Sequence, residues 1–196
     1  MKRLLFIIVL LLPVQGLDAQ SKTSFGSTNA SRCYEESNTP FSDYGLRFCT
    51  DAIREDDLML KDLAATHTNR GIIYAANGQY DEAMQDHNEA MLLAPEMGKI
   101  YVNRGNVYHQ LQDYDLALQD YAKAEELGNV PLDIIYYNRS LTLIRLKQWD
   151  LARQSLETAL EHNPDSSRIK RKLAQFEEPR DDPSPAVVDP DDVLDD

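Results

Sequence analysis

The sequence is short of cysteine, with two in 196 residues. This excludes a fold held together by many disulfides and a zinc site made of four cysteines. Basic residues are also few, since 20 lysines and arginines accompany 33 acidic residues and leave a formal net charge of −13. A nucleic-acid partner is therefore not expected, because phosphate contacts need clustered basic side chains.

The sequence also lacks the short motifs that mark common enzymes. Glycine is scarce, with eight residues, and no phosphate-binding loop, nucleophile elbow, HExxH motif or dinucleotide fingerprint is present. We therefore expect no enzymatic activity and no cofactor. A hydrophobic content of 42% is nevertheless sufficient for the core of one domain or of a short repeat array.

Long hydrophobic runs are absent except at the N-terminus, where residues 4–12 are all apolar. Lys2 and Arg3 precede this run and small residues follow it, which is the layout of a secretory signal peptide. As a helix the run rises about 14 Å, while a bilayer core is about 30 Å thick, so a membrane anchor is not expected. We predict a signal peptide at 1–19 and an exported chain, periplasmic in a bacterium and otherwise secreted or lumenal.

Two strings recur with a spacing of 34 or 35 residues. The first is Asn-Arg followed by Gly or Ser, at 69–71, 103–105 and 138–140. The second is an aromatic residue followed by Asp, with Ala three residues after the aromatic and Ala again seven residues later. Small residues at helical spacing allow two helices to approach closely, so each unit is predicted to be a pair of amphipathic helices.

These strings resemble the tetratricopeptide repeat (TPR) family. The resemblance implies an all-α fold, a TPR superhelical array of antiparallel helix pairs, or α-solenoid. Three positions depart from the family pattern, since His67 and His87 replace large apolar residues and Ser140 replaces glycine. The units implied are 64–97, 98–131 and 132–165.

Flanking segments are predicted to complete the array. Residues 166–178 fit a closing helix, capped by Asp165 or Ser166 and stopped by Pro179. Upstream, 42–63 resembles a degenerate half-repeat with its connector, whose first helix has been lost. Residues 20–41 form an N-terminal segment that carries one cysteine, and 179–196 form an acidic tail without helical period that is predicted to be disordered.

Because the chain is expected to be exported, a disulfide between Cys33 and Cys49 is the favoured interpretation. Closing such a loop contributes about 3 kcal/mol in the chain-entropy model. The alternative is two free thiols or a redox pair, although no CxxC spacing supports catalysis. None of the four histidines has another histidine or a cysteine four residues away, and no metal site is expected.

The TPR resemblance also implies a binding surface, because the first helix of each unit lines the concave side in that family. Asparagine side chains there can bond a peptide main chain as donor and acceptor. Lys99 with Asn103, then Asn138, then Arg168 with Lys172 resemble a clamp that holds a terminal carboxylate, with Arg and Lys exchanged in the last pair. The implied groove residues are Asn69, Lys99, Asn103, Asn106, His109, Tyr137, Asn138, Arg145, Arg168, Arg171 and Lys172.

A packing role is the alternative for these positions. The arginines of the Asn-Arg strings could pair with acids of the neighbouring unit, such as Asp86 and Asp120. The basic residues of the closing helix could instead solvate its outer face and complement its dipole.

The acidic tail is itself a candidate ligand. It ends with acidic residues around Val193 and Leu194 and a carboxylate, which resembles the peptides that clamp-type grooves bind. One hypothesis is that the tail masks the basic groove, and the alternative is a tail that only keeps the protein soluble. The function expected overall is a non-enzymatic protein-interaction module outside the cytoplasm that binds a peptide or protein segment, with an acidic or carboxylate-terminated segment as one candidate. The alternatives are an assembly or chaperone-like factor and a regulatory subunit of an enzyme.

Overall fold

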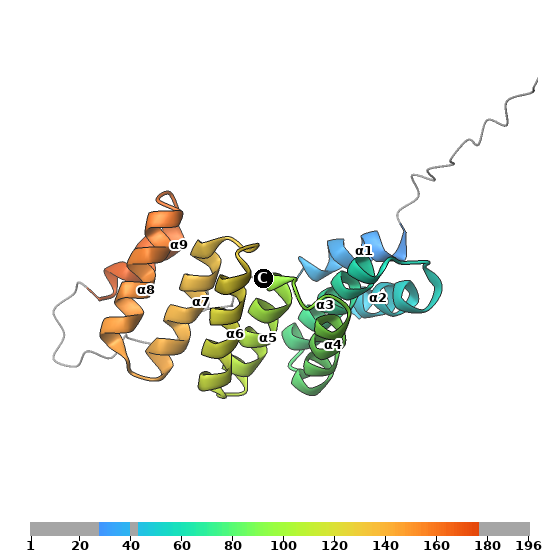
Figure 1. Cartoon of the computed structure of the whole chain (residues 1–196), viewed down its shortest axis with the longest axis horizontal. Coiled ribbons are helices and arrows are strands. Elements are labelled where there is room, and N and C mark those ends of the chain that lie inside the picture. Colours follow the sequence, from blue (N-terminus) through green and yellow to red (C-terminus); the bar gives the residue numbers. More distant parts are fainter. Residues whose placement is uncertain (1–27, 40–42, 177–196) are drawn as a thin grey trace, which may run out of the picture.

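The computed structural model describes residues 28–39 and 43–176. The predicted signal peptide at 1–19 and the predicted tail at 179–196 lie outside the described residues. Within these ranges the chain forms nine helices and no strand (Figure 1). The helices are α1 (Asn29–Ser37), α2 (Asp43–Glu55), α3 (Leu60–Ala76), α4 (Tyr80–Leu93), α5 (Gly98–Gln110), α6 (Tyr114–Leu127), α7 (Leu132–Arg145), α8 (Trp149–His162) and α9 (Ser167–Ala174).

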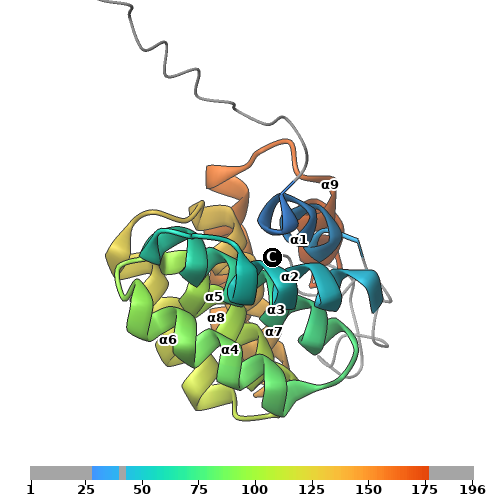
Figure 2. The ribbon, with the colours of Figure 1, turned by 90° about the vertical axis from the view of Figure 1, so that its right-hand side faces the viewer.

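Consecutive helices pack as antiparallel pairs that follow one another along the long axis of the molecule (Figure 1), which Figure 2 views from the α1–α2 end. Helix α3 contacts α5, and α5 contacts α7, whereas the part of the chain that is described shows no comparable packing between α4, α6 and α8. The first helices of the units therefore line the inner side of the array and the second helices diverge on the outer side. The predicted all-α solenoid of helix pairs is confirmed.

The small residue in each first helix is required by close packing inside the unit. A Cβ atom on Gly71 would lie 2.7 Å from the ring of His87, and one on Gly105 would lie 2.7 Å from the ring of Tyr121. In the third unit, Leu156 replaces the ring and the small residue is Ser140, which is buried and donates its hydroxyl to the carbonyl of Tyr137 at 2.6 Å. Where serine replaces glycine, the residue that packs against it on the second helix is thus also different.

The turn between the two helices of each unit uses a left-handed backbone. Gly78 adopts φ +74° at this position of the first unit. The equivalent residues of the next two units are Gln112, with φ +66°, and Lys147, with φ +58°. Side chains with a Cβ atom are strained in this region, so the second and third turns are less favourable than the first.

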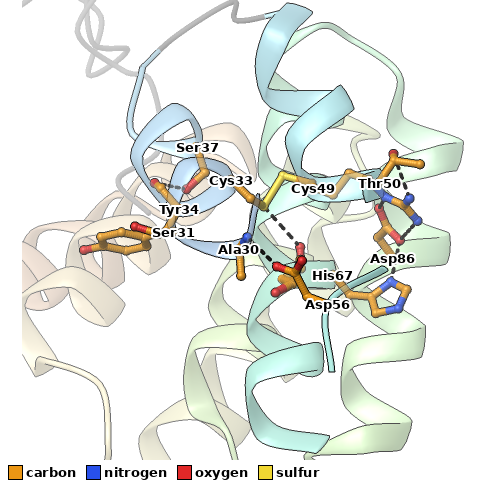
Figure 3. Close-up of a disulfide and its surroundings, with 12 residues drawn as sticks. Ala30, Ser31, Cys33, Tyr34, Ser37, Cys49, Thr50, Asp56, His67 and Asp86 are labelled. Atoms are coloured by element: carbon orange, nitrogen blue, oxygen red, sulfur yellow. Dashed lines mark hydrogen bonds and ion pairs between the residues drawn. A yellow bond between two sulfur atoms is a disulfide. The ribbon is translucent and has the colours of Figure 1, made fainter. Parts of the chain in front are cut away.

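The N-terminal unit differs from the prediction, because its first helix is present. Helix α1 begins after Thr28, whose hydroxyl accepts from the amide of Ser31 at 3.1 Å. The carboxylate of Asp56 accepts from the amide of Ala30 at 3.1 Å and so caps the same end (Figure 3). Since α1 packs on both α2 and α3, the α1–α2 pair is a complete helix pair and the expected loss of its first helix is wrong.

A disulfide joins α1 to α2 between Cys33 and Cys49, as the sequence predicted (Figure 3). Both cysteines are fully buried, and they pack with Ile73 of α3 in one apolar cluster. The disulfide therefore lies at the point where the short α1 meets the first repeat.

Helix α9 closes the other end of the array and is shorter than the predicted 166–178. Its N-cap is Ser166, one of the two expected caps, and the Ser166 hydroxyl accepts from the amide of Ile169 at 3.3 Å. Pro179 lies outside the described residues. Ile169 packs with Tyr137 and Leu141 of α7, so α9 covers the exposed end of the third unit.

Candidate functional site

Five side chains on the inner side of the second and third units form a hydrogen-bonded cluster. The amide of Asn138 donates to Oδ1 of Asn106 at 3.1 Å, and the same oxygen accepts from the hydroxyl of Tyr121 at 2.9 Å. Nδ1 of His109 lies 2.8 Å from Oγ1 of Thr142, which also interacts with the Tyr121 hydroxyl. These residues are Asn106, His109, Tyr121, Asn138 and Thr142, and they are called the α5–α7 polar cluster below.

Every member of the α5–α7 polar cluster is buried, with at most 8% of its surface exposed. Burial raises the pKa of the Tyr121 hydroxyl, which keeps it a donor at physiological pH. Because hydrogen bonds are stronger in a low-dielectric interior, such a network holds its side chains in one arrangement. The cluster thus orients polar groups at the junction of two units.

Three of its members were predicted as groove residues, and two were missed. Tyr121 belongs to a second helix, and Thr142 falls outside the repeated strings. A buried tyrosine hydroxyl needs a partner, which is the only signal in the sequence that could have indicated Tyr121.

A basic end adjoins the cluster at α9. The guanidinium of Arg168 lies over the ring of Tyr137, 4.4 Å from its centroid, which is a close cation–π contact. Arg171 is exposed, whereas Lys172 retains only 5% of its accessible surface. A lysine buried to this extent is found almost only where its charge is paired. The predicted residues Tyr137, Asn138, Arg168 and Lys172 therefore gather at the C-terminal part of the inner side.

The remaining predicted groove residues are not joined to this cluster by any contact given for residues 28–39 and 43–176. Asn69 is 7% exposed and Asn103 is 2% exposed. Neither amide atom of Asn103 has a hydrogen-bond partner in the part of the molecule that is described. Lys99 is partly exposed and Arg145 is exposed. The eleven predicted residues thus do not form one connected set, since Asn69, Lys99, Asn103 and Arg145 stand apart from the group around Tyr137 and Asn138.

The arginines of the Asn-Arg strings have a structural role, but the expected partner is corrected. Arg104 binds Asp120 with two hydrogen bonds of 2.8 Å, and Arg70 binds Asp86 in the same way at 2.7 and 2.8 Å. Each aspartate lies in the same unit as its arginine and not in the neighbouring one, because the second helix of a unit packs directly on the first.

The neighbouring unit is contacted by a different nitrogen of each arginine. Nη1 of Arg70 donates to the hydroxyl of Thr50 at 3.1 Å, and Nη1 of Arg104 donates to Oδ1 of Asn88 at 2.9 Å. Both acceptors belong to the second helix of the preceding pair. Arg139 lies over the ring of Tyr136, 5.8 Å from its centroid.

The two histidines that depart from the family pattern differ in their partners. His67 lies 2.8 Å from Asp86 through Nδ1. Burial opposes ionisation of Asp86, but the hydrogen bonds from Arg70 and His67 outweigh it and lower the pKa of this carboxyl. His87 is fully buried, neither ring nitrogen has a partner among the described residues, and burial lowers its pKa to about 4.

The described ranges contain neither a candidate metal site nor a helix that could cross a membrane. No group of three or more His, Cys, Asp or Glu side chains there is placed to hold a metal ion. None of the helices in the same ranges combines the length and the apolar character that a membrane crossing requires.

Three family models described as tetratricopeptide repeat match the chain, over residues 64–97, 98–127 and 134–166. No curated protein matches the sequence significantly.

Solved structures share the fold. The first TPR domain of human RPAP3 is 25% identical, with a TM-score of 0.54 over 57% of this chain and 87% of that domain. The first TPR of Spaghetti (RPAP3) bound to the HSP90 peptide SRMEEVD is 24% identical, with a TM-score of 0.55 over 58% of this chain and 92% of that one. MamA MSR-1 is 21% identical, with a TM-score of 0.56 over 74% of this chain and 81% of that one.

Proposed function

Because this chain belongs to the tetratricopeptide repeat family, we propose that it is a non-enzymatic interaction module whose inner side binds an acidic peptide with a terminal carboxylate. The observation that carries the proposal is the meeting of three kinds of group at one place. Asn138 of the α5–α7 polar cluster follows Tyr137 in α7, and the Arg168 guanidinium lies over the Tyr137 ring from a helix that carries three further cations.

Each kind of group suits part of such a ligand. An asparagine amide binds a peptide main chain through both a donor and an acceptor. A planar guanidinium group binds a carboxylate with two hydrogen bonds. The position of the Arg168 guanidinium over the Tyr137 ring limits the orientations that this group can take. The orphan amide of Asn103 provides a further donor and acceptor on the same helix as Asn106.

One of the similar structures supports this class of ligand. The Spaghetti (RPAP3) domain was solved with SRMEEVD, a peptide rich in acidic residues. In the clamp pattern of the family, Arg and Lys of the last pair stand in the opposite order. We therefore propose that Arg168, and not a lysine, binds the ligand carboxylate at that position of this chain.

We place this activity outside the cytoplasm. The apolar run at 4–12 has the layout of an export signal, and the buried disulfide of Cys33 and Cys49 belongs to an oxidising compartment. N-terminal sequencing of the protein isolated from its native host tests this location. A mature chain beginning at Gln20 supports export, and a chain that retains Met1 contradicts it.

Peptide binding is tested by fluorescence anisotropy with labelled SRMEEVD, carrying either a free or an amidated C-terminus. We expect Arg168→Gln and the amidated probe each to weaken binding by about tenfold, because each removes one partner of a charge-assisted contact. The matched control is Arg153→Gln, which removes the same charge from an exposed site on α8 that pairs with Glu157. Equal affinity for the two probes would refute carboxylate recognition.

The same assay separates the alternative functions. Binding of many unfolded proteins without dependence on Arg168 would indicate a chaperone-like factor. A change in the activity of one stoichiometric partner on mixing would indicate a regulatory subunit.

A further inference from the structure

We infer that the acidic segment 177–196 of this chain docks on its own inner side, against α9 and the α5–α7 polar cluster, and so competes with external ligands. This inference rests on the proposed function, because it names what regulates the same surface. The occupant is a segment that begins where the described residues end.

The charge of the segment complements the surface. Residues 177–196 contain nine acidic residues and one basic residue, a net charge of −8. Helix α9 carries four cations in eight residues, among them Arg168, Arg171 and Lys172. Attraction between opposite charges within one chain acts at a high local concentration, so even a weak contact is populated.

The chain leaves the described fold beside this surface. Phe176, the last described residue, packs on the cluster of Tyr137, Leu141 and Ile169. Tyr137 is also the ring on which Arg168 is seated. The segment therefore starts at the edge of the site and does not have to pass around the array to reach it.

The segment is also long enough. Twenty residues span at most about 66 Å when extended. Packed helices lie about 8–10 Å apart, so the two steps from α9 to α7 and from α7 to α5 cover about 16–20 Å. The segment is therefore long enough to reach the whole α5–α7 polar cluster.

The test uses the full chain and a variant in which Asp189, Asp191, Asp192 and Asp195 are each replaced by Asn. The matched control replaces Glu82, Glu89, Asp115 and Glu161 by their amides, because these exposed residues lie on the second helices and the change in charge is the same. Two quantities are measured, the affinity for labelled SRMEEVD and the backbone amide chemical shifts without any added peptide.

We expect the segment variant to bind the probe about tenfold more tightly than the unaltered chain, and the control to stay within about twofold of it. The difference should shrink at high salt, because screening weakens the intramolecular contact. Without the probe, the segment variant should change the amide shifts of α5, α7 and α9, and the control should not.

The outcomes separate this inference from the proposed function. Equal probe affinities for variant and unaltered chain, with unchanged inner-side shifts, would overturn the docking of the segment and leave the proposed function standing. Shift changes on α5, α7 and α9 with no probe binding by any protein would overturn the proposed function and leave the intramolecular contact. Shift changes confined to the second helices would also contradict docking on the inner side.

Discussion

Acid should destabilise this protein through one buried histidine. His87 stands in the first unit where Tyr121 stands in the second, and its ring packs on Gly71. In the second unit, the Tyr121 hydroxyl donates to the side-chain oxygen of Asn106. In the first unit, the position equivalent to Asn106 is Ile72, which offers no acceptor, and both ring nitrogens of His87 lack partners in the described ranges. The ring is therefore held in its neutral form.

The magnitude follows from the pKa of His87, about 4 in the folded state against 6.5 for the ordinary side chain. Between these values the unfolded chain binds more protons, so stability rises with pH across this window and is lost on acidification. A difference of about 2.5 pKa units corresponds to about 3 kcal/mol, nearly all of it lost between pH 6.5 and pH 4.

The change that tests this is His87→Phe, which keeps a ring of similar size and removes the titrating group. Urea unfolding followed by circular dichroism, at several pH values from 7.5 to 4, gives the free energy of unfolding of both proteins. The unaltered protein should lose about 3 kcal/mol more than the variant over this range. Protonation of Asp86 at low pH also lowers the stability, but it does so in both proteins and cancels in the comparison.

His162→Gln is the control for the loss of a histidine, because the His162 side chain is exposed. Parallel pH profiles for the unaltered protein and His87→Phe would refute the reasoning. The ring would then be protonated in the folded state or accessible to water.

Three further changes test other parts of the fold. Asp120→Asn should lower the free energy of unfolding by about 3 kcal/mol in urea titrations, because the half-buried Arg104 loses the carboxylate with which it pairs, and an unchanged midpoint would contradict this. Gln112→Gly should stabilise by about 1 kcal/mol in the same assay, since glycine tolerates φ +66°, and destabilisation would show that the side chain matters more than the backbone. Replacing Cys33 and Cys49 by Ala should cost about 3 kcal/mol in thermal melts, and reductant should lower the melting temperature of the unaltered chain alone.

The helix pairs were predictable because small residues recur at a fixed spacing, and Gly71 and Gly105 do lie closely against the second helix of their own unit. Helix α1 was not predictable in this way. It is nine residues long and buries Cys33 alone, so it has no apolar period, and a disulfide holds it in place.

The candidate site was predictable only in part. Register along the first helices placed Asn106, His109 and Asn138 on one side, and the structure joins them. Their burial and their hydrogen bonds depend on Tyr121, which lies on the second helix α6. The spacing of residues along the sequence does not indicate that contact. For the same reason the arginine partners were assigned to the wrong unit, since pairing follows the distance between helices rather than the order of repeats.

Hydrogen bonds from arginine join neighbouring units at two junctions of the array but not at the junction of the second and third units. Arg70 and Arg104 each tie their own unit to the helix pair before it, through Thr50 and Asn88. At the corresponding positions of the last junction the sequence has Ser155 in place of Asp120 and Ala122 in place of Asn88, so that bridge cannot be built. This junction is joined instead by the α5–α7 polar cluster and by the hydrogen bond from the Tyr136 hydroxyl to Glu125 at 2.7 Å. A repeat array behaves as a chain of nearest-neighbour couplings, so a peptide bound at this cluster would act on the coupling between the second and third units. Binding of a peptide at this site would then change the curvature of the whole solenoid, including the end that carries the disulfide.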